Sequence, residues 1–113
     1  MQHLSESELA ELRAALDAEK DSLEEELSEY GRKVGDDWVG TAGGEEEPDL
    51  VDAADKMEEL AVNVPLVEEL EKRYKEIREA LKRMDDGTYG ITAGGDPIDF
   101  DRLEANPAAT TNI

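Results

Sequence analysis

The first third of the chain carries apolar residues at the spacing of an α-helix. They recur in steps of three, four or seven residues, at Leu9, Leu12, Leu16, Leu23, Leu27, Tyr30 and Val34. Such steps place the side chains on one face, so the pattern predicts an amphipathic helix over residues 5–34. Ser5, followed three positions later by Glu8, forms a capping box, which predicts where this helix begins.

A second and longer apolar stripe occupies the middle and later part of the chain. Its members are Leu50, Ala54, Met57, Ala61, Val64, Val67, Leu70, Tyr74, Ile77, Leu81 and Met84. They predict a helix over residues 49–86, with Asp49 as a candidate N-cap and Gly87 as the residue that ends it. The step from Val64 to Val67 is three residues where the alternating pattern requires four, and Pro65 lies within this step. Because proline lacks a backbone N–H and crowds the preceding turn, we expect a kink near Pro65.

Two long amphipathic helices separated by a glycine-rich break bury their stripes most simply against each other. The predicted fold is therefore mainly α, a long antiparallel coiled-coil hairpin over residues 1–87. Residues 35–55 would form its tip. Residues 88–113 are too few for a core of their own, so we expect them to form a small cap with a turn and a brief helix, packed at the base of the hairpin.

Charge changes the picture at the predicted tip. The 113 residues hold 31 acidic and 12 basic side chains, a formal net charge of −19, and residues 34–63 alone hold ten acids against the single base Lys56. Such acidity argues against direct binding of nucleic acid or of an anionic membrane surface. There is neither a signal peptide nor an apolar run of the roughly 20 residues that span a membrane. We therefore expect a soluble, cytoplasmic protein.

The sequence carries little that points to catalysis. It has no cysteine, which excludes disulfides and thiolate metal sites, and its one histidine, His3, is expected to belong to an unpaired terminus. No nucleophile with a neighbouring base and no phosphate-binding loop is found. We expect a protein that is not an enzyme and that is a monomer when free.

Two separate stretches resemble one known family. Residues 87–91 (GTYGI), 97–98 (PI) and 102–110 (RLEANPAAT) are similar to the C-terminal module of the DksA/TraR-type regulators, which reads GTYGIC-x-x-CG, then I-x-x-x-RLEA-x-P, then a second cysteine pair. Residues 48–54 (PDLVDAA) resemble the D-x-x-D-x-A motif of the same family, at the start of its second long helix. The resemblance covers nearly the whole chain.

The resemblance implies a fold and a function. Members have a coiled-coil hairpin on a small four-cysteine zinc globule, bind RNA polymerase, and insert the acidic tip through its secondary channel without binding DNA. The implied tip contacts here are Asp49, Asp52 and Ala54, and the carboxylates of the two aspartates would act on catalytic Mg²⁺ or on basic residues around it. Further candidate contacts are Arg73, Arg78 and Trp38, and we expect Trp38 either to pack across the tip or to face the partner.

The cysteines of the family are missing from this chain. Residues 92–96 (TAGGD) and 110–113 (TTNI) stand where the two cysteine pairs belong. Because a structural zinc site needs four thiolate, imidazole or carboxylate ligands, we predict a degenerate zinc-finger-like cap with no zinc and no other cofactor.

Two alternative functions stay open at this point. One is a Gre-type transcript-cleavage factor, whose tip carboxylates would hold a second Mg²⁺ for RNA hydrolysis. The other is a coiled-coil adaptor that has lost its polymerase function together with the zinc.

Overall fold

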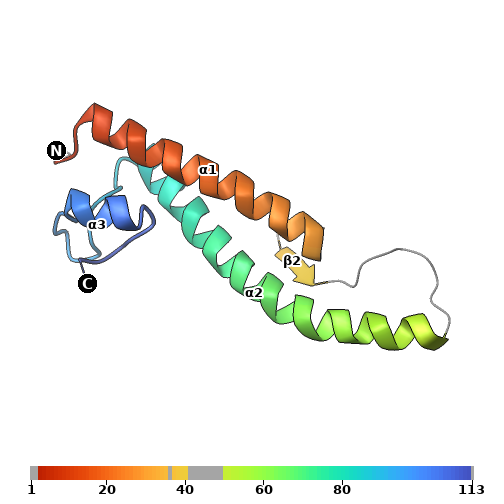
Figure 1. Ribbon diagram of the computed structural model, residues 1–113. Coiled ribbons are helices and arrows are strands. Elements are labelled where there is room, and N and C mark those ends of the chain that lie inside the picture. Colours follow the sequence, from red (N-terminus) through yellow and green to blue (C-terminus); the bar gives the residue numbers. More distant parts are fainter. Residues whose placement is uncertain (1–2, 36, 41–49, 113) are drawn as a thin grey trace. The chain divides into compact units, whose positions relative to one another are not determined.

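A computed structural model describes residues 3–35, 37–40 and 50–112, and no side chain of residues 50–56. The elements follow in the order α1 (Glu6–Tyr30), β1 (Gly31–Val34), β2 (Asp37–Gly40), α2 (Leu50–Asp86) and α3 (Phe100–Ala105) (Figure 1). They form two compact units. The cap unit combines Met1–Asp21 with Lys75–Ile113, and the middle unit is Ser22–Tyr74.

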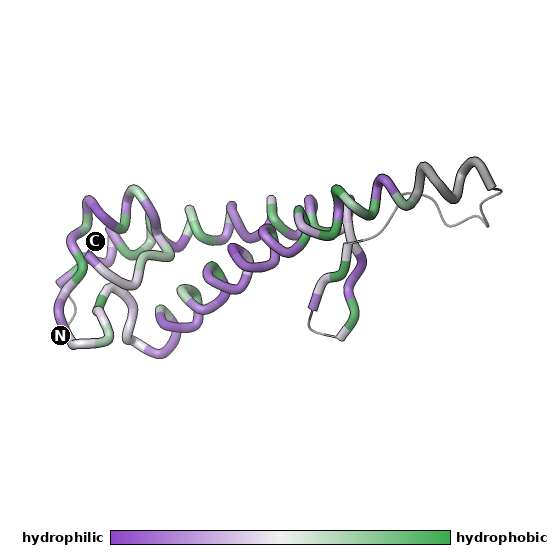
Figure 2. The backbone as a smooth tube through the Cα atoms, turned by 90° about the horizontal axis from the view of Figure 1, so that it is seen from below, coloured by the Kyte–Doolittle hydropathy of each residue, from purple (hydrophilic) through white to green (hydrophobic). Residues whose placement is uncertain are grey.

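The expected fold is confirmed, because it is mainly helical and the two long helices run antiparallel in each unit (Figure 1). Apolar positions recur at intervals along both helices, with polar positions between them (Figure 2). Their side chains supply the buried cores, Leu12, Leu16, Ile77 and Ala80 in the cap unit and Leu23, Leu27, Val67 and Tyr74 in the middle unit. None of the helices within the described ranges is long and apolar enough to cross a membrane.

The start of α1 has the predicted capping box. The backbone N–H of Ser5 donates to the Glu8 carboxylate at 2.9 Å, and the N–H of Glu8 donates to Ser5 Oγ at 3.0 Å. Two donors that a helix start would otherwise leave unpaired are therefore satisfied locally. One turn later, Arg13 Nη1 lies 3.0 Å from Asp85 Oδ1. This exposed ion pair contributes little energy, but it shows that the start of α1 lies beside the end of α2.

The cap begins where α2 ends. Gly87, with φ of 81°, reverses the chain, and the Thr88 N–H donates to the Arg83 carbonyl at 2.9 Å. A tight turn follows, closed by an Ile91–Pro97 bridge and by the Thr92 N–H, which donates to the Asp96 carbonyl at 2.8 Å. The brief helix predicted here is α3, and the core of the cap is supplied by Tyr89, Ile98 and Leu103.

The prediction of a first helix over residues 5–34 is wrong at its end. The helix stops at Tyr30, and the next residues form a β-hairpin in which Gly31 pairs with Gly40 and Val34 with Asp37. Gly31 disfavours a further helical turn, and Gly35 takes the positive φ of 62° that the reversal needs. The hairpin lies in the glycine-rich segment where only a break was expected.

Two glycines let this hairpin lie directly against its neighbours in the middle unit. A Cβ atom on Gly40 would come within 2.6 Å of Val64 Cα and 2.7 Å of Val64 N, so the strand meets the backbone of α2. A Cβ atom on Gly31 would come within 2.6 Å of the Val39 carbonyl oxygen and 3.1 Å of Val67 Cγ2. No other residue type fits at either position without a shift of backbone.

The second helix agrees closely with its prediction over residues 49–86, since α2 runs from Leu50 to Asp86 and residue 49 lies outside the described residues. Pro65 lies inside it. Helical hydrogen bonding therefore continues on both sides of the proline, and the kink stays a prediction. Of the predicted tip, residues 35–55, residues 36 and 41–49 fall outside the described residues.

We predict that Gly40→Ala destabilises the middle unit. The added methyl group meets backbone atoms that cannot rotate away, so the free energy of unfolding should fall by about 1–3 kcal/mol. Urea denaturation measures the change, and loss of cross-strand NMR contacts between the two strands locates it. The control is Gly94→Ala in the cap, where the nearest atoms to an added Cβ lie at 3.8 Å. Equal stability of Gly40→Ala and the unchanged protein would contradict the close approach.

Candidate functional site

The three predicted tip residues lie at or just before the start of α2. Asp49 lies outside the described residues, and Asp52 and Ala54 belong to the first turns of the helix, with side chains that are not described. A carboxylate in a first helical turn interacts favourably with the helix dipole, which is sufficient reason for Asp52 to be there. The partner-binding role of these residues therefore stays a prediction.

Apolar side chains are exposed on the middle unit. Trp38 is half-buried in β2, opposite Lys33, so part of the indole packs and part remains accessible. Among the described side chains of this unit, the large apolar ones that are exposed are Val34, Val39, Met57, Leu60, Val62 and Val64. Val62 is 65% exposed and Met57 is 71% exposed. These side chains are available to pack against another protein.

The two predicted basic contacts lie in different units. Arg73 is half-buried in the middle unit, and Arg78 is exposed in the cap unit. Arg78 lines a surface hollow of about 430 Å³ together with Lys75, Glu79 and Lys82. Three cations around one hollow are notable in so acidic a chain, because they offer a local site for an acidic partner group.

The N-terminal residues are tied to the cap, so the expectation that His3 is unpaired is wrong. His3 Nε2 donates to the Ile98 carbonyl at 2.7 Å. The neighbouring Leu4 is buried, and its Cδ1 lies 3.1 Å from where a Cβ atom of Gly90 would be. Gly90 also has a φ of 81°, so the conformation and the close approach both require glycine.

Side-chain hydrogen bonds hold the last residues of the chain on the cap. The Tyr89 hydroxyl donates to the Pro107 carbonyl at 2.6 Å, and Arg102 Nε donates to the Thr111 carbonyl at 3.2 Å. Asn112 accepts from the Asp99 N–H and donates to the Pro97 carbonyl, both at 3.1 Å. These bonds join segments that a zinc ion joins in the resembled family.

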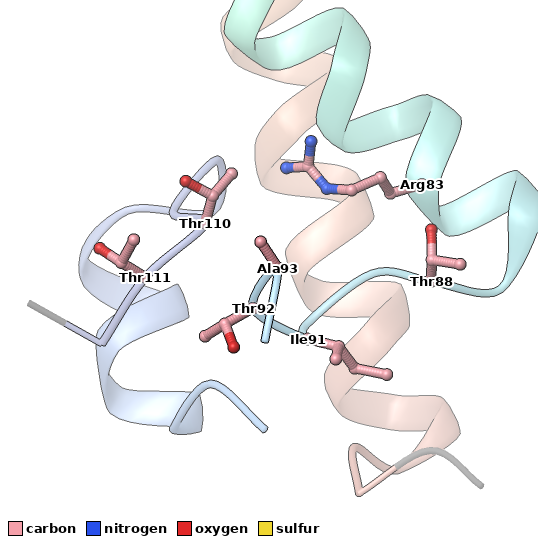
Figure 3. A pocket seen from close by; sticks show the side chains of 7 residues that line it. All are labelled: Arg83, Thr88, Ile91, Thr92, Ala93, Thr110 and Thr111. Carbon is pink, nitrogen blue, oxygen red and sulfur yellow. The ribbon is translucent and has the colours of Figure 1, made fainter. Parts of the chain in front are cut away.

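The residues at the expected metal position do not fit zinc. Thr92, Ala93, Thr110 and Thr111 face a cavity there, and none of them offers a thiolate, an imidazole or a carboxylate (Figure 3). Within the described ranges, no group of three or more histidine, aspartate and glutamate side chains is placed to hold a metal ion. The Arg83 guanidinium lines the same cavity, and its positive charge would repel a cation.

Arg83 also acts on the buried tyrosine of the cap. Burial raises the pKa of Tyr89 to about 12, although the nearby Arg83 guanidinium opposes the shift by favouring the phenolate. Desolvation is the larger effect because the side chain is 1% exposed. Tyr89 therefore remains a neutral hydrogen-bond donor throughout the physiological range.

Comparison with known proteins finds DksA transcription factors that are similar to this chain in sequence and in structure. No protein-family profile matches the chain. The RNA polymerase-binding transcription factor DksA of Caulobacter vibrioides is 36% identical over 70 residues, which are 61% of this chain and 49% of that protein. DksA of Escherichia coli is 28% identical over 109 residues, 96% of this chain and 68% of that protein. The structure of the transcription factor DksA2 from Pseudomonas aeruginosa matches with a TM-score of 0.69 and 26% identity, over 96% of this chain and 79% of that one.

The chain is a DksA homologue over most of its length. The family expected from its two motifs is thereby confirmed, and DksA proteins are transcription factors rather than enzymes, as expected. The chain spans about half the length of the Caulobacter relative that it matches.

Sequence reasoning missed three features of this DksA homologue. The β-hairpin has a signal in the sequence, since Val34, Trp38 and Val39 around a central glycine have the composition of paired strands. The contacts of His3 and Arg83 with the cap have no such signal in the sequence. Their partners lie far away along the chain or depend on how the turn folds back.

We predict that the cap loses stability at alkaline pH through Tyr89. Since its pKa is raised in the folded state, folding is unaffected below about pH 10 and weakens by about 1.4 kcal/mol per pH unit up to about pH 12. Urea denaturation across this range measures the slope. Tyr89→Phe should remove the slope and, by losing the bond to the Pro107 carbonyl, cost about 1 kcal/mol at neutral pH. Tyr30→Phe, outside the cap unit, is the control and should keep the slope; a slope that persists in Tyr89→Phe would refute the assignment.

Proposed function

We propose that this DksA homologue binds RNA polymerase and regulates transcription without contacting DNA itself. The observation that carries the proposal is the alignment with DksA of Escherichia coli over 96% of the chain, together with the D-x-x-D-x-A stretch at the start of α2. A net charge of −19 is incompatible with an extensive phosphate interface, so the effect on transcription is exerted through the enzyme.

In the proposed mechanism the acidic tip enters the secondary channel of the polymerase. The segment 34–63 carries ten acids and one base, a charge density that speeds encounter with a basic channel and makes the association rate fall as salt rises. Asp49 and Asp52 lie three residues apart in the sequence, a spacing that puts two side chains on one face of a helix. Ala54 leaves room for a close approach. The carboxylates then act on the catalytic Mg²⁺ or on the basic residues around it.

Other surfaces supplement the tip in this proposal. Trp38 and the exposed apolar residues of the middle unit supply contact area beside the tip segment, and the half-buried Arg73 lies in the same unit. The hollow lined by Lys75, Arg78 and Lys82 offers charge that suits an acidic surface of the polymerase. A protein that acts in this way works in the cytoplasm, and one helical hairpin per polymerase suffices, so we infer a monomer in the free state.

We predict that Asp49→Asn combined with Asp52→Asn keeps polymerase binding and abolishes the effect on transcription. The amides retain the size of the carboxylates and lose the charge that acts at the catalytic centre. Co-purification with the polymerase of the same organism measures binding, and the lifetime of promoter complexes measures the effect. The matched control is Glu68→Gln with Glu69→Gln, an equal loss of charge at two exposed positions of α2. It should leave both readouts unchanged.

The outcomes separate the competing functions. Failure of the unchanged protein to bind the polymerase would favour the adaptor that has lost this function. Shortening of RNA in backtracked complexes would favour the Gre-type cleavage factor. A normal transcriptional effect in the doubly substituted protein would refute the role of the tip carboxylates, whether or not the polymerase is bound.

We further propose that the cap of this homologue folds without structural zinc. The support is chemical, because no cysteine exists in the chain and a guanidinium lines the cavity where the metal would lie. Packing of Tyr89, Ile98 and Leu103 and the hydrogen bonds of Asn112 would then supply the cohesion that a metal supplies elsewhere.

We predict that a chelator leaves the cap folded. Melting temperature and the amide NMR spectrum of residues 88–112 should be the same with and without EDTA, and elemental analysis should find less than one zinc per chain. Leu103→Ala shows that the assay detects a damaged cap, since loss of this fully buried side chain should cost about 2–5 kcal/mol. Loss of the cap signals on addition of EDTA to the unchanged protein would contradict the proposal.

A further inference from the structure

The cap contains a cavity whose chemistry differs from that of a metal site. Its volume is about 450 Å³, and it is lined by Arg83, Thr88, Ile91, Thr92, Ala93, Thr110 and Thr111. All of these residues belong to the cap unit. Four of them, the threonines at 88, 110 and 111 and Ala93, are exposed, so the cavity is reachable from solvent. Its volume lies within the range of about 300–1,000 Å³ that is usual for small-molecule sites.

The Arg83 guanidinium lacks an acceptor in this cavity. Among the buried side-chain nitrogen and oxygen atoms of the described residues, Arg83 Nη2 is the one without a hydrogen-bond partner. A buried N–H without an acceptor is costly, and more so on a charged group. In Figure 3 the guanidinium extends from α2 toward the segments that carry Ala93 and Thr110. A ligand with an acceptor oxygen would relieve this cost.

The rest of the wall is largely apolar. Ile91 and Ala93 contribute hydrocarbon, and in Figure 3 the methyl group of Thr110 lies on the side of the guanidinium while its hydroxyl lies on the far side. The Thr92 hydroxyl already accepts the Asp96 N–H at 3.1 Å. One unpaired cationic donor within an apolar wall suits a ligand that has an anionic end and an apolar body.

We propose that this cavity binds a small carboxylate with an apolar body. The carboxylate accepts hydrogen bonds from the Arg83 guanidinium, whose planar array of donors matches two carboxylate oxygens. The apolar body lies among Ile91, Ala93 and the threonine methyl groups. Because the chain as a whole carries a charge of −19, it does not attract anions in general, and an anion that binds here is held by these local contacts.

Sodium benzoate is the probe that tests the proposal. Titration into the 113-residue chain at constant ionic strength, followed by amide NMR, should give saturable shifts at residues 92, 93, 110 and 111. Benzamide has the same shape without the charge, and inorganic phosphate has charge without the apolar body. Both should bind at least about tenfold more weakly, because a charge-assisted hydrogen bond and burial of the ring are each worth that factor or more.

Two variants assign the binding to Arg83. Arg83→Met should weaken benzoate binding by about tenfold or more and leave the weak binding of benzamide unchanged. It removes an unpaired buried charge, so the fold should persist, and the amide spectrum checks this. Lys82→Met, the exposed neighbour on the same helix, is the matched control and should bind benzoate normally.

Three results would overturn the proposal. The first is an absence of saturable shifts with benzoate, and the second is equal benzoate affinity in Arg83→Met and the unchanged protein. The third is phosphate binding as tight as benzoate binding, which would identify a site for an inorganic oxyanion instead.

Discussion

The cap depends on a small buried core, which consists of Tyr89, Ile98 and Leu103. These three side chains are at most 1% exposed, and they form the core of a segment too short to fold alone. Everything else in the cap is arranged around them. Gly90 lets Leu4 approach, His3 reaches the Ile98 carbonyl, and the Tyr89 hydroxyl binds the Pro107 carbonyl at 2.6 Å.

This arrangement explains how a DksA homologue can lack the cysteines of the resembled family. A zinc ion would tie two turns together through four strong bonds. In the proposed zinc-free cap, hydrogen bonds between the same segments take that role, and Asn112 alone bonds to both Asp99 and Pro97. The cavity at the segments that correspond to the two cysteine pairs is lined by Arg83. A change from a cation site to a cationic wall reverses the charge of ligand that the cavity can hold.

Close approach of backbones organises the middle unit in a different way. Gly40 brings β2 against α2 near Val64, and Gly31 lets the chain turn from α1 directly into β1. The hairpin thereby adds Trp38 and Val39 to the surface of the middle unit. In the proposed function, this surface accompanies the acidic segment toward the polymerase, so contact area and charge are supplied by neighbouring parts of one unit.

The sequence by itself determined the helical framework and the family. The bonds between Ser5 and Glu8 and the burial of Leu12, Leu16 and Ile77 follow from spacing within a few turns, where the interacting groups are neighbours along the chain. The roles of Asp49, Asp52 and Ala54 stay predictions, since they depend on a partner.

Only the tertiary structure decided the hairpin, the anchoring of His3 and the environment of Arg83. The local pattern of residues 31–34 continues the helical stripe, and the alternative strand gains its stability from pairing with residues 37–40 and packing on Val64 and Val67. His3 and Ile98 are 95 positions apart. Contacts of this kind are decided by which surfaces meet when the chain folds, and no pattern of neighbouring residues encodes them.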